Sequence, residues 1–197
     1  DGDGTLYSRD GNDYIQSRGV GSSGNRLLDG TTDRADAYGG DGDDIIWSSA
    51  RNSTIDGGDG IDMIAMYSFG RDQSGPAGAQ DSFTHWIGGA GTDYFHFESD
   101  YLDSNVYVTI DDFVSTVDVL EVSLARVGNS MPRAGVNPGL LVQGAGATAT
   151  HATGQFIFDT TTHMLSYDAD GTGAVEARPL AVLAGVTSIF ASDIYIF

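Results

Sequence analysis

A nine-residue repeat constrains the fold of this chain more than any other feature of its sequence. Residues 39–47, 57–65 and 88–96 each read Gly-Gly-x-Gly-x-Asp-x-apolar-x, and the first two are offset by two full repeats. Repeats at a fixed period build stacks in which each copy buries its apolar residues against its neighbours. The sequence therefore predicts a repetitive stack of short, turn-rich units.

The apolar eighth position of the repeat reveals the period. It recurs every nine residues from residue 28 to residue 64 and then resumes at residue 86: Leu28, Ala37, Ile46, Ile55, Ile64, Trp86 and Phe95. The step from Ile64 to Trp86 exceeds one period by thirteen positions, so we expect a loop insertion near residues 66–78. Upstream, residues 11–15 keep only half a unit, which predicts a degenerate first coil.

Charge and composition exclude several functions. The chain carries 28 acidic residues against nine arginines and no lysine, for a net charge of −19, so we expect no nucleic-acid partner. No apolar run approaches the roughly 18 residues of a membrane span. The absence of Cys excludes disulfides and zinc thiolate sites, and the many aspartates favour calcium. Scattered histidines and the lack of a Gly-x-Ser-x-Gly motif predict no enzyme; any catalytic domain would lie upstream of this fragment.

The repeats resemble the nonapeptides of the RTX (repeats-in-toxin) family. Residues 110–113, 118–123, 155–159, 165–173 and 191–197 are similar to the C-terminal region of the serralysin-like subgroup. This resemblance implies an all-β fold, with a parallel β-roll over residues 1–97 and a mostly antiparallel β cap over residues 98–197. Within the cap, residues 156–158 and 165–167 are expected to pair as a hairpin.

The resemblance also implies the metal site. Two nonapeptides would form each coil, so that the turns 39–44, 57–62 and 88–93 stack and hold one Ca²⁺ between each adjacent pair. The implied metal residues are Gly39, Asp41, Gly42, Asp44, Gly57, Asp59, Gly60, Asp62, Gly88, Gly91, Asp93, Asp112 and Asp118. Asp112 and Asp118 either close the last site or simply cap strand ends. Asp168 and Asp170 indicate a polar turn first and an ion second, and a glycine-rich stack without ions is the alternative for the whole set.

The function that follows is a noncatalytic calcium-binding module of a secreted bacterial protein. Such a module folds on binding calcium outside the cell, and residues 193–197 would carry the signal for the type I secretion machinery. Its location would be extracellular or at the cell surface. The alternative is a calcium-dependent surface-layer, adhesin or carbohydrate-contact assembly module, with specificity in the insertion and in residues 127–153.

Overall fold

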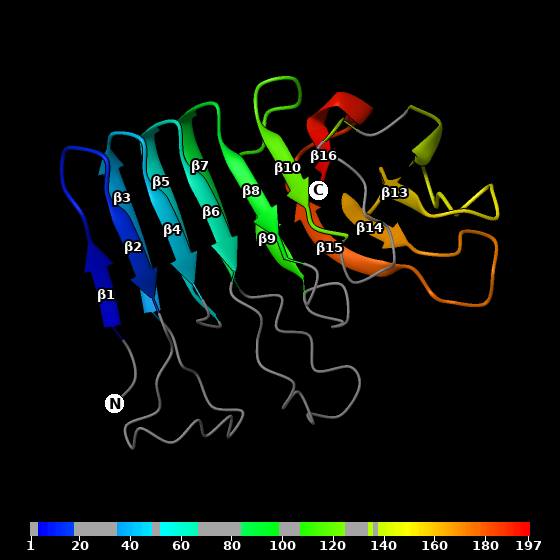
Figure 1. The fold of residues 1–197 in the computed structure, drawn as a ribbon, viewed down its shortest axis with the longest axis horizontal. Helices are drawn as coiled ribbons and strands as arrows, with labels where there is room; N and C mark the ends of the chain where they lie inside the picture. Colours follow the sequence, from blue (N-terminus) through cyan, green and yellow to red (C-terminus); the bar gives the residue numbers. More distant parts are fainter. Residues whose placement is uncertain are drawn as a thin grey trace, which may run out of the picture.

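The computed structural model describes residues 4–17, 35–48, 52–66, 84–98, 107–124, 134–135 and 138–197. These ranges contain β-strands and two 3₁₀ turns, η3 (Pro138–Leu140) and η4 (Ala191–Asp193), and no α-helix. The strands form one nine-stranded and one seven-stranded sheet, whose buried side chains share one core, and both sheets extend along the molecule (Figure 1). The prediction of an all-β protein is confirmed at this level.

The nine-stranded sheet begins with parallel strands and ends with mixed ones. Its order is β1 (Gly4–Tyr7), β3 (Ala35–Asp41), β5 (Thr54–Gly60), β7 (His85–Gly91), β9 (Val108–Ile110), β15 (Arg178–Leu183), β14 (Met164–Asp168), β13 (Gln155–Asp159) and β12 (Leu141–Gly144). Pairing is parallel from β1 to β15, antiparallel from β15 through β14 to β13, and parallel between β13 and β12.

The seven-stranded sheet is parallel except at one edge. Its order is β11 (Ala134–Gly135), β16 (Ile194–Ile196), β10 (Val119–Val122), β8 (Tyr94–Phe97), β6 (Met63–Met66), β4 (Ile45–Ser48) and β2 (Tyr14–Ser17). Among these described strands, β11 alone runs antiparallel to its neighbour. From β1 to β10 the chain alternates between the two sheets, so each pair of consecutive strands makes one coil of a stack.

The register of the stack shows how far each coil is displaced along the sequence. Ile46 pairs with Ile64, two periods later, whereas Ile15 pairs with Ile46 and Ile64 with Phe95, each two periods and thirteen positions later. The second of these longer steps agrees with the predicted insertion, although Leu28 and residues 67–78 lie outside the described residues. The sequence of the first coil is degenerate, as predicted, yet β1 and β2 still form a coil in register with the next one.

The apolar ladder of the repeat builds the core. The predicted inward residues Ala37, Ile46, Ile55, Ile64, Trp86 and Phe95 are all fully buried, with 0 % exposure. The rings of Trp86 and Phe95, from opposite sheets, stack with centroids 6.2 Å apart. Burying a large apolar side chain contributes about 1.5–3 kcal/mol, so the ladder holds the two sheets together.

Beyond residue 98, the structure differs in part from the predicted antiparallel cap. The predicted hairpin is confirmed, since β13 and β14 pair antiparallel with Phe158 opposite Leu165. However, β9, β10 and β16 continue the two sheets in parallel. The reason lies in the connections: β9 and β10 are entered by crossing from the other sheet, whereas a tight turn joins β13 directly to β14 and reverses the chain. Both sheets therefore run across residue 98, and a domain boundary there stays a prediction.

No helix in the described part of the chain has the length and apolar character needed to cross a membrane.

Candidate metal centre

The three predicted turns lie side by side along one edge of the stack. They connect β3 to β4, β5 to β6 and β7 to β8, at the upper edge in Figure 1. Gly40 pairs with Gly58 and Gly58 with Gly89, so equivalent positions of successive turns are adjacent in the parallel ladder. The stacking of these turns, expected from the repeat, is therefore confirmed.

The sixth position of each turn forms a hydrogen-bonded row, here called the aspartate ladder. The Asp13 N–H donates to Asp44 Oδ1 (2.7 Å), and the Asp44 N–H donates to Asp62 Oδ1 (2.8 Å). The Asp62 N–H donates to Asp93 Oδ1 (3.0 Å), and the Asp93 N–H donates to Asp118 Oδ1 (3.1 Å). One oxygen of each accepting carboxylate thus fixes the backbone of the preceding coil, which orients its second oxygen.

The second oxygens of two carboxylates in the aspartate ladder have no hydrogen-bond partner within the described structure. Asp44 and Asp62 are 1 % and 0 % exposed, and the Oδ2 atoms of both are buried and unpaired there. A buried polar atom without a partner costs about 1–3 kcal/mol, and more when it is charged. These two oxygens therefore need a positive or hydrogen-donating group.

Each unpaired oxygen faces a backbone carbonyl of the next coil across a glycine. A Cβ placed on Gly39 would overlap both Asp44 Oδ2 and the Gly57 carbonyl oxygen. A Cβ placed on Gly57 would overlap Asp62 Oδ2 and lie 2.6 Å from the Gly88 carbonyl oxygen. We call these places cradle 1 (Gly39, Asp44, Gly57) and cradle 2 (Gly57, Asp62, Gly88). In each, two oxygens converge where only glycine leaves space.

The arrangement changes at the end of the repeat. The three atoms nearest to a Cβ on Gly88 would all belong to Asp93, and Asp112 accepts the N–H groups of Gly88 (2.9 Å) and Gly89 (2.8 Å). The second oxygen of Asp118 accepts the Val114 N–H at 2.7 Å. The carboxylates of Asp112 and Asp118 are thus both engaged by backbone groups, which is the strand-end capping alternative. A metal-binding role for these two residues stays a prediction.

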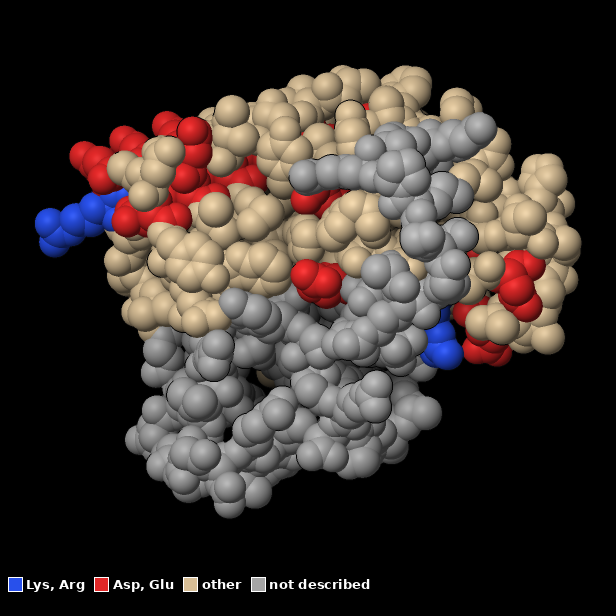
Figure 2. Space-filling view, in the orientation of Figure 1, with Lys and Arg blue, Asp and Glu red and all other residues tan. Residues whose placement is uncertain are grey.

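The remaining predicted residues support the stack from outside the cradles. Asp41 and Asp59 are paired in register and exposed. Figure 2 shows acidic side chains gathered at the end of the molecule where β1 and β3 lie. Gly42, Gly60 and Gly91 have φ angles of 130°, 147° and 147°, and a Cβ on Gly60 would overlap the Gly42 carbonyl oxygen. These glycines allow the coils to approach closely.

The electrostatics of the ladder favour protonation or a cation. Burial raises the pKa of Asp62 to about 7, and the carboxylates of Asp93 and Asp44 add to the shift. Burial likewise raises the pKa of Asp93 to about 6, with contributions from Asp118 and Asp112. The pKa values of Asp44 and Asp118 are also raised, mainly by burial. A neighbouring cation would shift all of these pKa values in the opposite direction.

The cradles do not depend on side chains alone. Among the described residues, no three His, Cys, Asp or Glu side chains come together as a group that could hold a metal ion. Each cradle instead combines one carboxylate with a backbone carbonyl. Backbone and carboxylate oxygens are both ligands of Ca²⁺, so this donor chemistry fits the ion that the sequence predicts.

The structure adds one turn that the sequence analysis missed. Residues 8–13 connect β1 to β2 next to the turn 39–44, and the Ser8 hydroxyl donates a hydrogen bond to Asp13 Oδ2. The spacing of the aspartates could have predicted this turn, because the interval from Asp13 to Asp44 equals the interval from Asp62 to Asp93.

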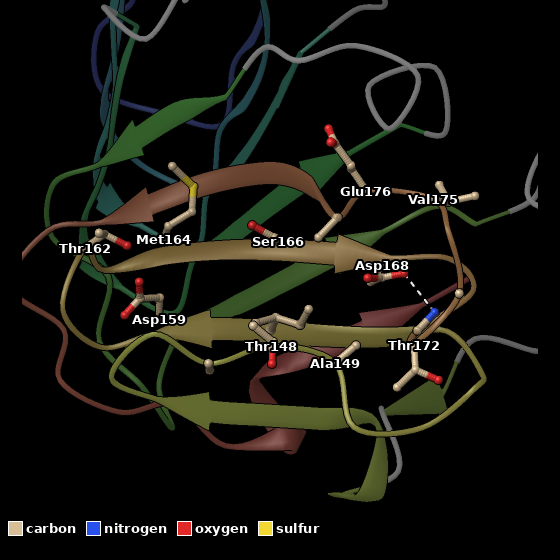
Figure 3. A pocket seen from close by; sticks show the side chains of 15 residues that line it. Thr148, Ala149, Asp159, Thr162, Met164, Ser166, Asp168, Thr172, Val175 and Glu176 are labelled. Carbon is tan, nitrogen blue, oxygen red and sulfur yellow. Dashed lines mark hydrogen bonds between the residues drawn. The ribbon is translucent and has the colours of Figure 1, made fainter.

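The predicted polar turn at Asp168 is present. Asp168 Oδ1 accepts the N–H groups of Asp170 (3.2 Å) and Gly171 (2.8 Å). Figure 3 shows that Asp168 borders an open pocket over β13 and β14, together with Asp159, Met164, Ser166 and Glu176. Asp159 accepts the N–H groups of Gly146 and Thr161, both at 2.9 Å. The carboxylates of Asp159 and Asp168 therefore stabilise the pocket's own turns.

No protein-family model matches this chain, and no curated protein matches it either.

Proposed function

We propose that the stacked coils are an RTX-type parallel β-roll, closed by the C-terminal strands as a cap, and that cradles 1 and 2 each bind one Ca²⁺. The observation that carries this proposal is the buried, unpaired Oδ2 of Asp62 facing the Gly88 carbonyl oxygen. Asp44 Oδ2 and the Gly57 carbonyl repeat the arrangement one coil earlier. A cation between the oxygens would satisfy both and neutralise the carboxylate.

Calcium fits the cradles better than the other common cations. Ca²⁺ accepts six to eight oxygens in a flexible shell, whereas Mg²⁺ requires a strict octahedron and retains several waters. The register of parallel strands fixes the carbonyl positions, so the protein adapts little to a small ion. Zinc prefers nitrogen and sulfur ligands, and neither cradle offers them.

Calcium binding would couple folding to location. The chain carries a net charge of −19, and the folded turns bring several carboxylates together. At about 1 mM calcium, a site with a dissociation constant of about 0.1 mM stabilises the fold by about 1.4 kcal/mol, and at submicromolar calcium by almost nothing. The module would therefore stay loosely folded inside a calcium-poor cell and fold outside it. We propose a noncatalytic role in a secreted bacterial protein, with residues 193–197 as the type I secretion signal.

Two matched double variants test the metal assignment. Asp44→Asn with Asp62→Asn removes both cradle carboxylates, whereas Asp41→Asn with Asp59→Asn removes the same charge from exposed positions of the same turns. We expect isothermal titration calorimetry to show two calcium ions in the wild type and in the exposed-site variant, and none in the cradle variant. Equal calcium binding by the two variants, or none by the wild type, would refute the proposal.

The second candidate function is a calcium-dependent assembly module. It is favoured by the apolar side chains at the N-terminal end of the stack, where Leu6, Tyr7 and Tyr14 are 44 %, 74 % and 62 % exposed. Edge strands with exposed apolar residues can pair with another chain. Light scattering distinguishes the two functions, because a secretion module stays monomeric on calcium addition and an assembly module grows.

A further inference from the structure

Four turns of the stack have their six positions in register, and they differ in the residue at the first position. In the turn 8–13, Ser8 occupies the place that Gly39, Gly57 and Gly88 occupy in the later turns. The alignment follows from the register, since Tyr7 pairs with Tyr38 and the Ser8 N–H donates to the Tyr38 carbonyl oxygen at 2.9 Å. The sixth positions agree, because the Asp13 N–H donates to Asp44 Oδ1.

The side chain of Ser8 fills the place that is open in the cradles. Its hydroxyl donates to Asp13 Oδ2, the same carboxylate oxygen that is buried and unpaired in Asp44 and Asp62. In the later turns, the position of a Cβ at Gly39 or Gly57 coincides with the point where the carboxylate and the carbonyl oxygens converge. A serine there therefore supplies both the missing hydrogen-bond donor and the bulk that would exclude an ion.

We propose that the first residue of the turns 8–13, 39–44 and 57–62 determines whether each of these turns binds a cation, and that the Ser8 hydroxyl replaces the cation in the first turn. This inference rests on the proposed calcium binding by cradles 1 and 2. A hydroxyl satisfies one carboxylate oxygen without a charge, so the first turn closes without metal. Gly39 and Gly57 leave the oxygens of Asp44 and Asp62 unsatisfied, so cradles 1 and 2 require an ion.

Reciprocal substitutions at the first position test this inference in the full chain, with calcium stoichiometry from isothermal titration calorimetry as the measurement. We expect Ser8→Gly to bind one calcium ion more than the wild type and Gly57→Ser to bind one fewer. Ser8→Ala should match the wild type, because its methyl group still fills the place of the ion. Ser8→Ala is therefore the matched control for Ser8→Gly, because both remove the hydroxyl that donates to Asp13 Oδ2 and only Ser8→Gly also removes the Cβ.

The outcomes separate this inference from the calcium assignment. A wild type that binds no calcium overturns both. A wild type that binds two ions, with Ser8→Gly also binding two or Gly57→Ser still binding two, overturns only the role of the first position. Circular dichroism in calcium shows whether each variant folds. If Gly57→Ser does not fold, the comparison of Ser8→Gly with Ser8→Ala decides alone, because both change only the first turn.

Discussion

Replacing Asp62 by asparagine is expected to have opposite effects with and without calcium. In the metal-free chain, the amide oxygen of the substituted side chain can still accept the Asp44 N–H, a bond of 2.8 Å in the wild type. The substitution removes a buried carboxylate whose pKa burial raises to about 7, so the variant should be at least as stable as the wild type in chelator. In calcium, the variant loses the anionic ligand of cradle 2.

The size of the calcium effect follows from binding linkage. At about 1 mM calcium, losing a site with a dissociation constant of about 0.1 mM costs about 1.4 kcal/mol. For a chain of about 150–250 residues, 1 kcal/mol changes the melting temperature by about 2–4 °C, so the loss corresponds to about 3–6 °C. Cradle 1 should keep its ion, because the amide oxygen at position 62 still accepts the Asp44 N–H.

Thermal unfolding followed by circular dichroism, in chelator and in calcium, measures both effects. Asp59→Asn is the control, since Asp59 is exposed in the same turn and the charge change is identical. The reasoning fails if Asp62→Asn is less stable than the wild type by the same amount in both conditions, or if Asp59→Asn loses as much calcium stabilisation.

Three other predictions concern pH and the C-terminal strand. In chelator, the stability of the chain should rise as the pH falls from about 8 to about 5. Burial raises the folded-state pKa of Asp62 to about 7 and of Asp93 to about 6, so the folded state binds more protons than the unfolded state in this range. Urea unfolding measures this, and a free energy of unfolding that stays constant or decreases as the pH falls contradicts it. Asp193→Ala should lower the free energy of unfolding by about 3 kcal/mol, because the buried carboxylate accepts hydrogen bonds from the Ser115 hydroxyl (2.6 Å) and the Phe190 N–H (2.9 Å). The control is Ser192→Ala at the exposed neighbouring position, which should change the free energy of unfolding by less than about 0.5 kcal/mol. Equal losses in the two variants would argue against a stabilising role of the Asp193 hydrogen bonds. Deleting residues 193–197 should abolish export through a type I system. The deletion should also destabilise the seven-stranded sheet, because Ile194 pairs with Leu120 in β10. Undiminished export in a secretion assay would remove the signal assignment, although the assignment of the fold would still stand.

The stack and its core could be predicted from the repeat alone. The period of nine places apolar residues from Ala37 to Phe95 at equivalent positions, and all of the described ones are buried as expected. The same period aligned the turns of Asp44, Asp62 and Asp93. These features are predictable because each depends on a local pattern that the chain repeats, and stacked copies of one unit bury a continuous core.

The use of the carboxylate oxygens depends on contacts that form only when the coils stack. The sequence predicts ligands at Asp44 and Asp62 and leaves Asp118 as either a ligand or a strand-end cap. In the structure Asp118 has both oxygens bonded to backbone N–H groups, while Asp44 and Asp62 each keep one oxygen buried and unpaired within the described residues. The difference depends on whether another coil follows, which is a contact between distant segments.

Long-range pairing also decided the rest of the architecture. The parallel continuation of the sheets through β9, β10 and β16 depends on strand contacts that no local pattern specifies. The contact of Ser8 could not be predicted from a local sequence pattern either. In the sequence it is a departure from the repeat, and its hydroxyl meets the Asp13 carboxylate only because the turn folds as the later turns do.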